Sequence, residues 1–307
     1  MAVVGIDIGG TKCTVALADA QGEPVQTRRF PTAGPWETLE RVGACVEALG
    51  VGEAPVFGIA CGGPLDAAGG VVLSPPNLPG WDRVPVVRLM EERFGGRAFV
   101  MNDANAGVLA EWQAGAGRGR RHVVFLTLGT GFGAGVICDG RLLEGASGQA
   151  GEIGHVRVTD DGPVGYGKRG SAEGWCSGGG IGRRVADLMA TGRLPRDWPY
   201  RNAKALAEAA RAGETEAKAI FAETGRRLGQ CVAMLVDVLN PEVIVLGSLF
   251  LRAADLIEGP MREVLAKEAL PASLAACTIV PAGLGERLPE YQAVAVAHYR
   301  LGLLAGE

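Results

Sequence analysis

Apolar and polar positions near the N-terminus alternate with the period of a β-strand. Residues 3–8, 14–18 and 24–30 are apolar or alternating runs, and the turn-forming segments Gly9–Lys12 and Asp19–Gly22 separate them. Short runs bounded by glycine and aspartate are typical of strands joined by tight turns. The pattern therefore predicts an antiparallel meander of three strands.

The following segments switch between helical and strand patterns. Residues 36–49 place apolar side chains at helical spacing, and residues 56–60 form a short apolar run. After an irregular, proline-rich segment, the pattern predicts a helix at 84–94, a buried strand at 98–101 and a helix at 104–114. This succession of strands and helices indicates an α/β unit.

The pattern of the first strands then returns 120 residues later. VVGIDIGGTKCTVALAD (3–19) aligns without a gap on VVFLTLGTGFGAGVICD (123–139), and both read as strand, glycine-rich turn, strand and Asp-led turn. Only four positions are identical, so the matching order of apolar and turn positions carries the argument. A repeat of this size predicts two domains of one topology, while chance similarity of two hairpins remains the alternative.

The rest of the chain continues in helical and strand patterns. It predicts a loop region at 144–177, helices at 181–189, 203–212 and 214–239, a strand at 243–246, a helix at 256–268, a strand at 277–281 and a final helix at 291–304. A chain of 307 residues exceeds most single cores. We expect an N-terminal α/β domain at 1–118, with the C-terminal segment 290–307 packing back on it, and a larger C-terminal α/β domain at 119–289.

Composition narrows the class of protein. Hydrophobic residues make up 48% of the chain, and the net charge of −4 has both signs interspersed, so no nucleic-acid surface is expected. The seven cysteines are odd in number and lack metal-ligand spacing, which favours a reducing compartment. The N-terminus does not resemble a signal peptide, and the apolar stretch 231–251 carries charged residues. We therefore expect a cytoplasmic protein without membrane contact.

Glycine-rich turns occupy equivalent places in the two halves: Gly9, Gly10 and Thr11 in the first, and Gly129, Thr130 and Gly131 in the second. Glycine lets backbone N–H groups approach an anion, a threonine hydroxyl adds a donor, and Lys12 could add charge. For one turn alone an ordinary hairpin is the alternative, but two such turns favour a nucleotide held between the halves. Residues 129–134 also match a dinucleotide-binding fingerprint. That motif must be followed by a helix, and because a strand is expected here instead, we reject it.

Two acidic residues are candidates for chemistry. Asp7 lies in the first strand, where an unpaired buried carboxylate would be costly. A water-mediated Mg²⁺ contact, or a salt bridge to Lys12 or an arginine, would account for it. Asn102 and Asp103 end the strand at 98–101, where α/β sheets bind ligands. Asp103 could equally cap the following helix, and this stretch alone leaves both readings open.

The predicted loop region holds the remaining polar candidates. Gly151–His155 (GEIGH) sets Glu152 and His155 among glycines, and Glu173 follows. Recognition of sugar hydroxyls is the functional reading, and a structural loop histidine is the alternative. No G-x-S-x-G elbow occurs, so nucleophilic Ser/His/Asp chemistry is not supported.

Together these motifs resemble the ROK family of sugar kinases and repressors over nearly the whole chain. The resemblance implies a two-domain, actin-like ATPase fold, that is, a duplicated ribonuclease H-like α/β fold. The matching motifs are DIGGTK (Asp7–Lys12) and LGTGFGAG (Leu128–Gly135) for the two phosphate loops, NPEVIVLGS (Asn240–Ser248) for the adenosine region, NDANA (Asn102–Ala106) for the catalytic segment, and GEIGH with Glu173 for sugar contacts.

The resemblance also implies roles for single residues. Asp103 would be the general base, and Asp7 would contact Mg²⁺ through water. The sugar-binding positions would be Gly63, Asn77, Asn102, Glu152, His155 and Glu173. The ATP-binding positions would be Gly9, Gly10, Thr11, Lys12, Gly129, Thr130, Gly131 and Gly247. The small-molecule partners would be a sugar and ATP, and the resemblance implies a homodimer.

Two departures from the family pattern matter. Many members carry a zinc loop of the form C-x-C-G-x-x-G-C-x-E after the histidine, but this chain has Val164, Tyr166 and Ser171 at the three cysteine positions. Since zinc needs thiolate or imidazole ligands, we predict no zinc, and His155 must be oriented by hydrogen bonds or packing. Repressor members carry a helix-turn-helix domain first, whereas DIGGTK begins here at residue 7, which favours an enzyme.

The expected reaction is transfer of the γ-phosphate of ATP to a hexose hydroxyl, with the 6-hydroxyl of glucose as first choice. SPPNLPGW (Ser74–Trp81) resembles the glucokinase-like members. Mannose, fructose, allose and N-acyl hexosamines remain alternatives, as does polyphosphate as donor. A non-catalytic sugar- or nucleotide-sensing protein is the second class, although Asp103 and both glycine-rich turns argue against it.

Overall fold

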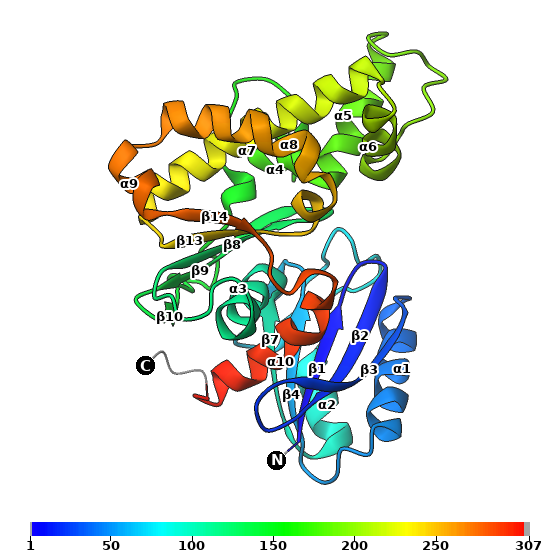
Figure 1. Ribbon diagram of the computed structural model, residues 1–307. Coiled ribbons are helices and arrows are strands. Elements are labelled where there is room, and N and C mark those ends of the chain that lie inside the picture. The colour runs from blue at the N-terminus through cyan, green and yellow to red at the C-terminus, as the bar shows by residue number, and fades with distance from the viewer. Residues whose placement is uncertain (1, 304–307) are drawn as a thin grey trace. The chain divides into compact units, whose positions relative to one another are not determined.

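The computed structural model describes residues 2–303; Met1 and residues 304–307, which include the end of the predicted segment 290–307, lie outside the described residues. The described chain divides into two compact units. Unit 1 comprises residues 2–121, 137–143 and 286–303, and unit 2 comprises residues 122–136 and 144–285. The chain forms two five-stranded sheets of mixed strand direction (Figure 1).

The first sheet has the strand order β3-β2-β1-β4-β7. Its strands are β1 (Val3–Ile8), β2 (Lys12–Ala18), β3 (Pro24–Pro31), β4 (Val56–Cys61) and β7 (Arg97–Asn102). β1, β2 and β3 form the predicted antiparallel meander, while β4 and β7 run parallel to β1. Ile8, Cys61 and Asn102 are in register at the ends of the parallel strands, so the loops that follow them lie at one edge of the sheet.

The second sheet repeats this topology with the order β10-β9-β8-β13-β14. Its strands are β8 (Val123–Leu128), β9 (Phe132–Cys138), β10 (Arg141–Leu142), β13 (Val243–Leu246) and β14 (Thr278–Pro281). β8 and β9 begin and end 120 residues after β1 and β2, and the last two strands are again parallel to the first. The predicted duplication of topology is therefore confirmed.

Opposite faces of the first sheet pack against different helices. Alternate residues of β1, namely Val4, Ile6 and Ile8, join the apolar core that α1 (Pro35–Ala48) and α2 (Val86–Phe94) cover. The side chains of β1 that point to the other face meet α10 (Leu288–Arg300), the red helix of Figure 1.

Two paired glycines let α10 lie close to the sheet. Gly5 on β1 is in register with Gly58 on β4. A Cβ added at Gly58 would lie 1.9 Å from the carbonyl oxygen of Ala293, and one at Gly5 would lie 2.8 Å from the backbone nitrogen of Val294. Side chains at these positions would therefore push the helix away. α3 (Asp103–Ala114) packs beside α10.

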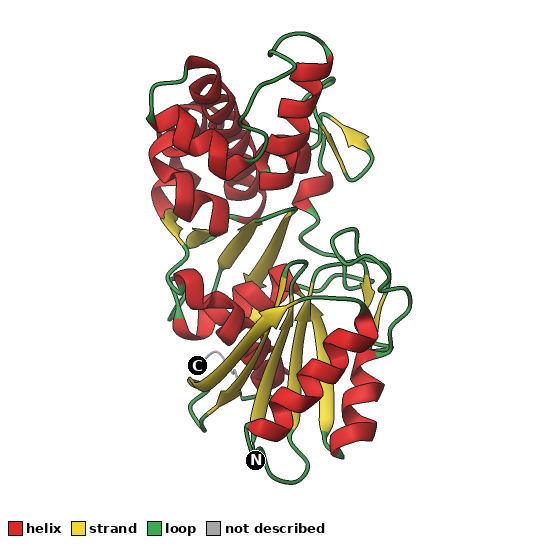
Figure 2. Cartoon of the chain, turned by 90° about the vertical axis from the view of Figure 1, so that its right-hand side faces the viewer, coloured by secondary structure: helices red, strands yellow, loops and turns green. Residues whose placement is uncertain are grey.

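Unit 2 is largely helical, and its helices gather on one side of its strands (Figure 2). Val124, Leu126 and Leu128 of β8 belong to one apolar core with residues of the helices, among them Phe221 and Ile257. The helices are α4 (Ala172–Cys176), α5 (Gly178–Ala190), α6 (Ala203–Arg211), α7 (Thr215–Leu239), α8 (Ser248–Glu268) and α9 (Pro271–Ala276).

Short elements are where the sequence prediction was wrong. The expected loop 144–177 contains the 3₁₀ turn η1 (Ile153–His155), the hairpin β11 (Val164–Gly165) and β12 (Lys168–Arg169), and α4. β5 (Leu65–Asp66), β6 (Val71–Val72) and α9 were also missed. The missed strands have two residues each and the missed helical segments have three to six, which is fewer than two helical turns, so neither shows a repeated hydrophobic period. α8 begins at Ser248 rather than at 256, with a kink at Ala253.

Candidate functional site

Asp103 is the first residue of a helix at the end of a parallel strand. β7 ends at Asn102, and the side-chain oxygen Oδ1 of Asn102 accepts a hydrogen bond from the backbone N–H of Ala104 at 2.9 Å. Asn102 is thus the N-cap of α3, and the alternative reading of Asp103 as the cap is wrong. Burial raises the pKa of the Asp103 carboxyl, while the backbone N–H groups of Ala104 and Asp103 oppose this rise. The capping hydrogen bond is thus assigned to Asn102, and Asp103 is the first residue inside the helix.

Glycines and an asparagine surround this carboxyl within unit 1. A Cβ added at Gly62 would lie 3.9 Å from Oδ2 of Asp103 and 3.6 Å from Nδ2 of Asn77. A Cβ added at Gly10 would lie 3.2 Å from Nδ2 of Asn77, and one at Gly63 would lie 3.4 Å from Nδ2 of Asn102. The structure thus brings five predicted residues together at the edge where β1, β4 and β7 end: Gly10, Gly63, Asn77, Asn102 and Asp103.

Asp7 is a second acid in unit 1 and is only 9% exposed. Its Oδ1 accepts a hydrogen bond from Nε2 of Gln292 on α10, and no ion pair to Asp7 is seen among residues 2–303. Burial raises the pKa of the Asp7 carboxyl to about 7; the bond from Gln292 opposes this rise, and the Asp103 carboxylate adds to it. A salt bridge to Lys12 or an arginine, one of the alternatives for Asp7, is therefore not seen in the described chain, although the charges of Arg29 and Lys12 lower the Asp7 pKa.

The first glycine-rich turn is fixed by the strand that ends beside it. The backbone N–H of Gly9 donates to Lys12 O, Oγ1 of Thr32 donates to Gly9 O at 2.6 Å, and the N–H of Thr32 donates to Thr11 O. In the described chain, the N–H groups of Gly10 and Thr11 have no backbone partner. These two N–H groups are available as donors to a ligand.

The second glycine-rich turn is held through its carbonyl groups. The N–H groups of Gly178 and Gly179, at the start of α5, donate to the carbonyls of Gly129 and Thr130 at 2.8 and 3.2 Å. The hydroxyl of Ser248 donates to Leu128 O, and the backbone of Gly247 lies against the end of β8, donating to Leu126 O. No hydrogen bond is seen from the N–H groups of residues 129, 130 and 131 within the described chain. The turn therefore presents three donors of the kind that bind an anion.

Glu173 lies directly beside this second turn. A Cβ added at Gly131 would lie 3.0 Å from Oε2 of Glu173, and the same oxygen accepts a hydrogen bond from the N–H of Phe132 at 3.4 Å. The other carboxylate oxygen pairs with Nη2 of Arg183 at 3.4 Å. The Glu173 carboxylate is thus engaged by the turn and by Arg183.

The GEIGH segment packs on the strand that follows the second turn. Gly151 has a φ of +94°, and a Cβ there would lie 1.9 Å from Ala134 O; a Cβ at Gly154 would lie 1.9 Å from Phe132 O and 3.4 Å from Cβ of Glu173. Only glycine permits this approach to β9. The segment therefore holds Glu152 and His155, both exposed, next to Glu173 in unit 2.

The loop after His155 offers no thiolate to a metal. Ser171 stands at one of the three positions where the zinc-loop pattern has cysteine, and its buried hydroxyl donates to Gly165 O and accepts from the N–H of Gly174, both at 3.2 Å. Val164 has no ligating side chain. One imidazole and a hydrogen-bonded hydroxyl do not fit a structural zinc site. Among residues 2–303, no three His, Cys, Asp or Glu side chains are grouped to hold a metal ion.

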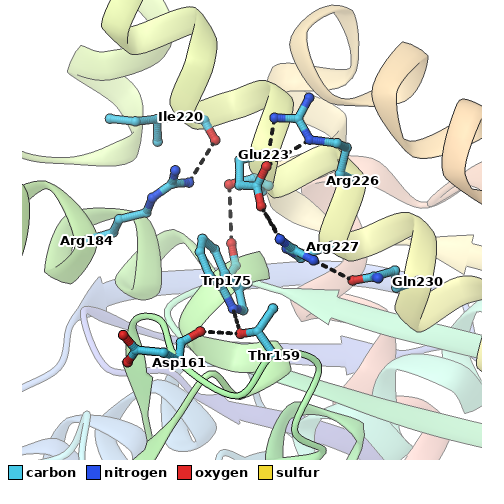
Figure 3. Close-up of polar contacts among 10 residues, drawn as sticks. Thr159, Asp161, Trp175, Arg184, Ile220, Glu223, Arg226, Arg227 and Gln230 are labelled. Carbon is cyan, nitrogen blue, oxygen red and sulfur yellow. Dashed lines mark hydrogen bonds and ion pairs between the residues drawn. The ribbon is translucent and has the colours of Figure 1, made fainter.

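Trp175 anchors the short helix that carries Glu173 (Figure 3). Its Nε1 donates to Oγ1 of Thr159 at 2.8 Å, and the guanidinium groups of Arg184 and Arg227 lie 4.9 and 5.2 Å from the centroid of its ring. Glu223 on α7 in turn pairs with Arg227. Cation–π contacts on both guanidinium groups fix α4, and with it Glu173, to α5 and α7.

Sequence reasoning missed several residues at these sites. Gln292 is the single amide in the apolar run YQAVAVA, and a lone polar side chain on a buried helix was an available signal. The predicted helix at 181–189 begins too late, because Ser177 caps α5 through the N–H of Gly180 and the glycine run 178–180 opens the helix that binds the second turn. Gly62 carried no signal of its own, because its role comes from its distance to Asp103.

Known proteins match the chain over almost its whole length. The ROK family model matches residues 3–299. The glucokinase of Thermotoga maritima is 33% identical over 311 residues, which covers 98% of this chain and 98% of that protein.

In the part of the chain that the structure describes, no helix is long and apolar enough to cross a membrane.

Solved structures show the same fold. The crystal structure of a ROK hexokinase from Thermus thermophilus has a TM-score of 0.83 and 30% identity, covering 98% of this chain and 99% of that one. That of a ROK family glucokinase from Streptomyces griseus, in complex with glucose and AMPPNP, has a TM-score of 0.76 and 29% identity, covering 97% and 99%. With the repeated sheet topology, these likenesses confirm the predicted duplicated, actin-like α/β fold.

Proposed function

Because the chain belongs to the ROK family, we propose that it is a kinase that transfers the γ-phosphate of ATP to a hexose, with the 6-hydroxyl of glucose as the acceptor. The whole-length similarity to a glucokinase supports the reaction and the sugar. The similar enzyme that was crystallised with glucose and AMPPNP, an analogue of ATP, supports the nucleotide.

The observation that carries the proposal is the environment of Asp103. Its carboxyl is half-buried at the end of a parallel strand, its pKa is raised by burial, and it does not cap its helix. A carboxylate with a raised pKa is a better proton acceptor than an exposed one. In the proposed reaction, Asp103 accepts the proton of the sugar hydroxyl while that oxygen attacks the γ-phosphorus, and ADP leaves.

The two glycine-rich turns supply the nucleotide contacts in this proposal. The unbonded N–H groups of Gly10, Thr11 and residues 129–131, together with the charge of Lys12, bind the phosphates. Gly9 keeps the first turn tight, the hydroxyl of Thr130 adds a donor, and Gly247 lets the adenosine approach the backbone. Phosphoryl transfer then depends mostly on positioning and electrostatics.

Magnesium fits the donor set of unit 1. Asp7 uses Oδ1 for Gln292, and its other oxygen has no hydrogen bond among the described residues. Carboxylate and water oxygens are the ligands that Mg²⁺ prefers, so Asp7 would hold the ion through water. The ion, when bound to ATP, neutralises charge on the phosphates.

In this proposal, amide, carboxylate and imidazole groups bind the remaining hydroxyls of the sugar. In unit 1, Asn77 and Asn102 can donate and accept, and Gly63 leaves room for a ring beside Asp103. In unit 2, Glu152, His155 and Glu173 stand together on the GEIGH segment and α4. A polyhydroxylated ring suits this set, because carboxylates accept from hydroxyls while amides do both.

A coupled ADP-release assay tests the proposal. Purified protein with Mg²⁺ and ATP is assayed against glucose, mannose, fructose, allose and N-acetylmannosamine, and then against glucose with polyphosphate in place of ATP. We expect the highest kcat/KM with glucose and ATP. Absence of turnover with every sugar, together with sugar binding by calorimetry, would establish the non-catalytic sensing protein instead. Sedimentation velocity in the same buffer tests the homodimer that the resemblance implies.

A further inference from the structure

The hairpin β11–β12 carries a bulky residue at its tip in an unfavourable conformation. Its two-residue turn is Tyr166-Gly167, and both residues have left-handed backbones, with φ of +46° and +76°. Such a turn normally selects asparagine or aspartate followed by glycine. Tyrosine is costly there, and its side chain is 60% exposed rather than packed in a core. Neither the turn nor the core therefore accounts for Tyr166.

What Tyr166 contacts is the side chain of His155. The two ring centroids are 6.0 Å apart with an interplanar angle of 78°, an edge-to-face arrangement. In residues 2–303, no hydrogen bond to the His155 ring nitrogens is seen. The tyrosine ring is thus the contact that the structure shows for the imidazole.

The same hairpin holds the backbone of His155. Nζ of Lys168, the residue after the turn, donates to the carbonyl oxygen of His155 at 2.8 Å. Tyr166 and Lys168 therefore both contact His155: Tyr166 packs against its ring, and Lys168 bonds to its main chain. We call these two residues the hairpin clamp.

The base of the hairpin is fixed to Glu173. The hydroxyl of Ser171 bonds to Gly165 O, and Nε of Arg183 donates to Val164 O at 2.9 Å. Nη2 of the same Arg183 pairs with Glu173. The clamp on His155 and the carboxylate of Glu173 are thus set by one connected network.

We propose that Tyr166 is a positioning residue for His155, and that it sets the affinity of the kinase for its sugar. The proposal rests on the proposed function, in which His155 and Glu173 bind sugar hydroxyls. Packing of an aromatic edge restricts the imidazole to one orientation before the sugar arrives, so binding does not have to order it. The strained turn residue is then explained by a functional contact rather than by folding.

The test replaces Tyr166 by residues that separate the turn from the contact. Tyr166→Asn suits the left-handed turn and removes the ring, whereas Tyr166→Phe keeps the ring. Ala54→Asn is the matched control, since Ala54 is another exposed residue with a left-handed φ, of +49°. Sugar KM, ATP KM, kcat and the thermal midpoint are measured for each variant. The proton NMR signals of the His155 ring, assigned among three histidines with His155→Asn, are recorded without substrate.

We expect Tyr166→Asn to keep or raise the thermal midpoint, because asparagine suits the left-handed turn, and to move the His155 signals and raise the sugar KM roughly three- to tenfold, with kcat and ATP KM unchanged. Tyr166→Phe and Ala54→Asn should behave as wild type. In the His155→Asn background, Tyr166→Asn should add no further rise in sugar KM. An unmoved His155 signal, an unchanged sugar KM, or an equal rise in both KM values would overturn the proposal.

The experiment distinguishes a failure of the proposed kinase function from a failure of the proposal for Tyr166. If the wild-type protein releases no ADP with any sugar, the kinase assignment fails, and the clamp is judged on the NMR signals and on sugar affinity by calorimetry. A moved His155 signal with weakened sugar binding in Tyr166→Asn then still supports positioning, and unmoved signals overturn it.

Discussion

The two glycine-rich turns occupy the same place in a repeated topology, yet their surroundings differ. The turn after β1 is bound by Thr32 at the end of β3, and Asn77 and two acids lie near it. The turn after β8 gives its carbonyls to the N–H groups that open α5, and a single carboxylate, Glu173, lies beside it. The two halves therefore share the hairpin, and they differ in the groups from distant segments that contact its turn.

The strand residue that precedes each turn shows the divergence most clearly. Asp7 and Thr127 are equivalent under the shift of 120. Asp7 is buried against Gln292 with a raised pKa, whereas Oγ1 of Thr127 accepts a hydrogen bond from the N–H of Gly133 at 3.1 Å. The Asp7 position thus carries an electrostatic cost, whereas the Thr127 side chain bonds to a neighbouring backbone N–H. This contrast fits the proposal that unit 1 holds the reactive groups and that unit 2 mainly binds.

The largest expected effect comes from comparing a carboxylate of unit 1, that of Asp103, with a carboxylate of unit 2, that of Glu173. Asp103→Asn removes the proposed proton acceptor without loss of volume, so kcat should fall about 1000-fold while sugar affinity stays within about threefold. Glu173→Gln keeps a polar side chain beside the second turn and should lower kcat/KM only about tenfold. Steady-state ADP release and calorimetry with glucose measure both variants. Near-normal turnover in Asp103→Asn would show that the reactive half has been misidentified.

The next effect concerns stability and its pH dependence at Asp7. The folded state raises the Asp7 pKa from 3.8 to about 7, so the folded carboxyl stays protonated while the unfolded one ionises. Stability from this group is therefore complete below pH 3.8 and is lost as pH rises through about 7. Asp7→Asn does not titrate and can still accept from Gln292.

We expect Asp7→Asn to exceed the wild type in unfolding free energy by about 2–4 kcal/mol at pH 8, and by much less at pH 4. Urea unfolding at both pH values, without divalent cations, measures the difference. The same variant should need more Mg²⁺ for half-maximal activity. If the two proteins lose stability in parallel between pH 4 and pH 8, Asp7 does not carry this cost.

A smaller effect compares the turns themselves. A Cβ at Gly10 would lie 2.7 Å from the carbonyl oxygen of Asn77, whereas a Cβ at Gly129 would meet only the hydroxyl of Ser248, at 3.8 Å. Gly10→Ala should therefore lower the unfolding free energy by about 1–3 kcal/mol, and Gly129→Ala should leave it unchanged or raise it by about 0.5 kcal/mol.

Chemical denaturation of the two alanine variants measures this contrast, and ATP KM tests the phosphate contact. Gly129→Ala should raise ATP KM although it is stable, because a methyl group obstructs the approach of an anion to the turn. Equal stability of the two variants would mean that the crowding at Gly10 is relieved by movement of Asn77.

The sequence predicted what depends on repeated local patterns. The strands β1, β4 and β8, the meander and the 120-residue repeat all follow from apolar runs bounded by glycine, and the structure confirms them. What escaped prediction depends on contacts between distant segments. Gln292 meets Asp7 across 285 positions, and no period in the sequence announces such a pair.

The elements near His155 escaped for a different reason. The hairpin with Tyr166 at its tip has strands of two residues each, a single period of a strand pattern, so no repeat is visible in the sequence. The expectation that packing or hydrogen bonding orients His155 stays a prediction, and the edge-to-face contact with Tyr166 supports it. The partner could not be named from sequence, because tyrosine in a left-handed turn is not a preferred choice.

The smallest effect tests the Thr127 side of the comparison. Thr127→Val conserves shape and removes the acceptor for the N–H of Gly133, which leaves a half-buried donor without its partner. The unfolding free energy should fall by about 1 kcal/mol, with the same loss at pH 4 and pH 8, since no titrating group is involved. Urea unfolding of this variant beside Asp7→Asn measures two changes of opposite sign at equivalent positions. A gain in stability from Thr127→Val would mean that Thr127, like Asp7, is kept for binding at a cost to the fold, and the division into a reactive and a binding half would no longer hold.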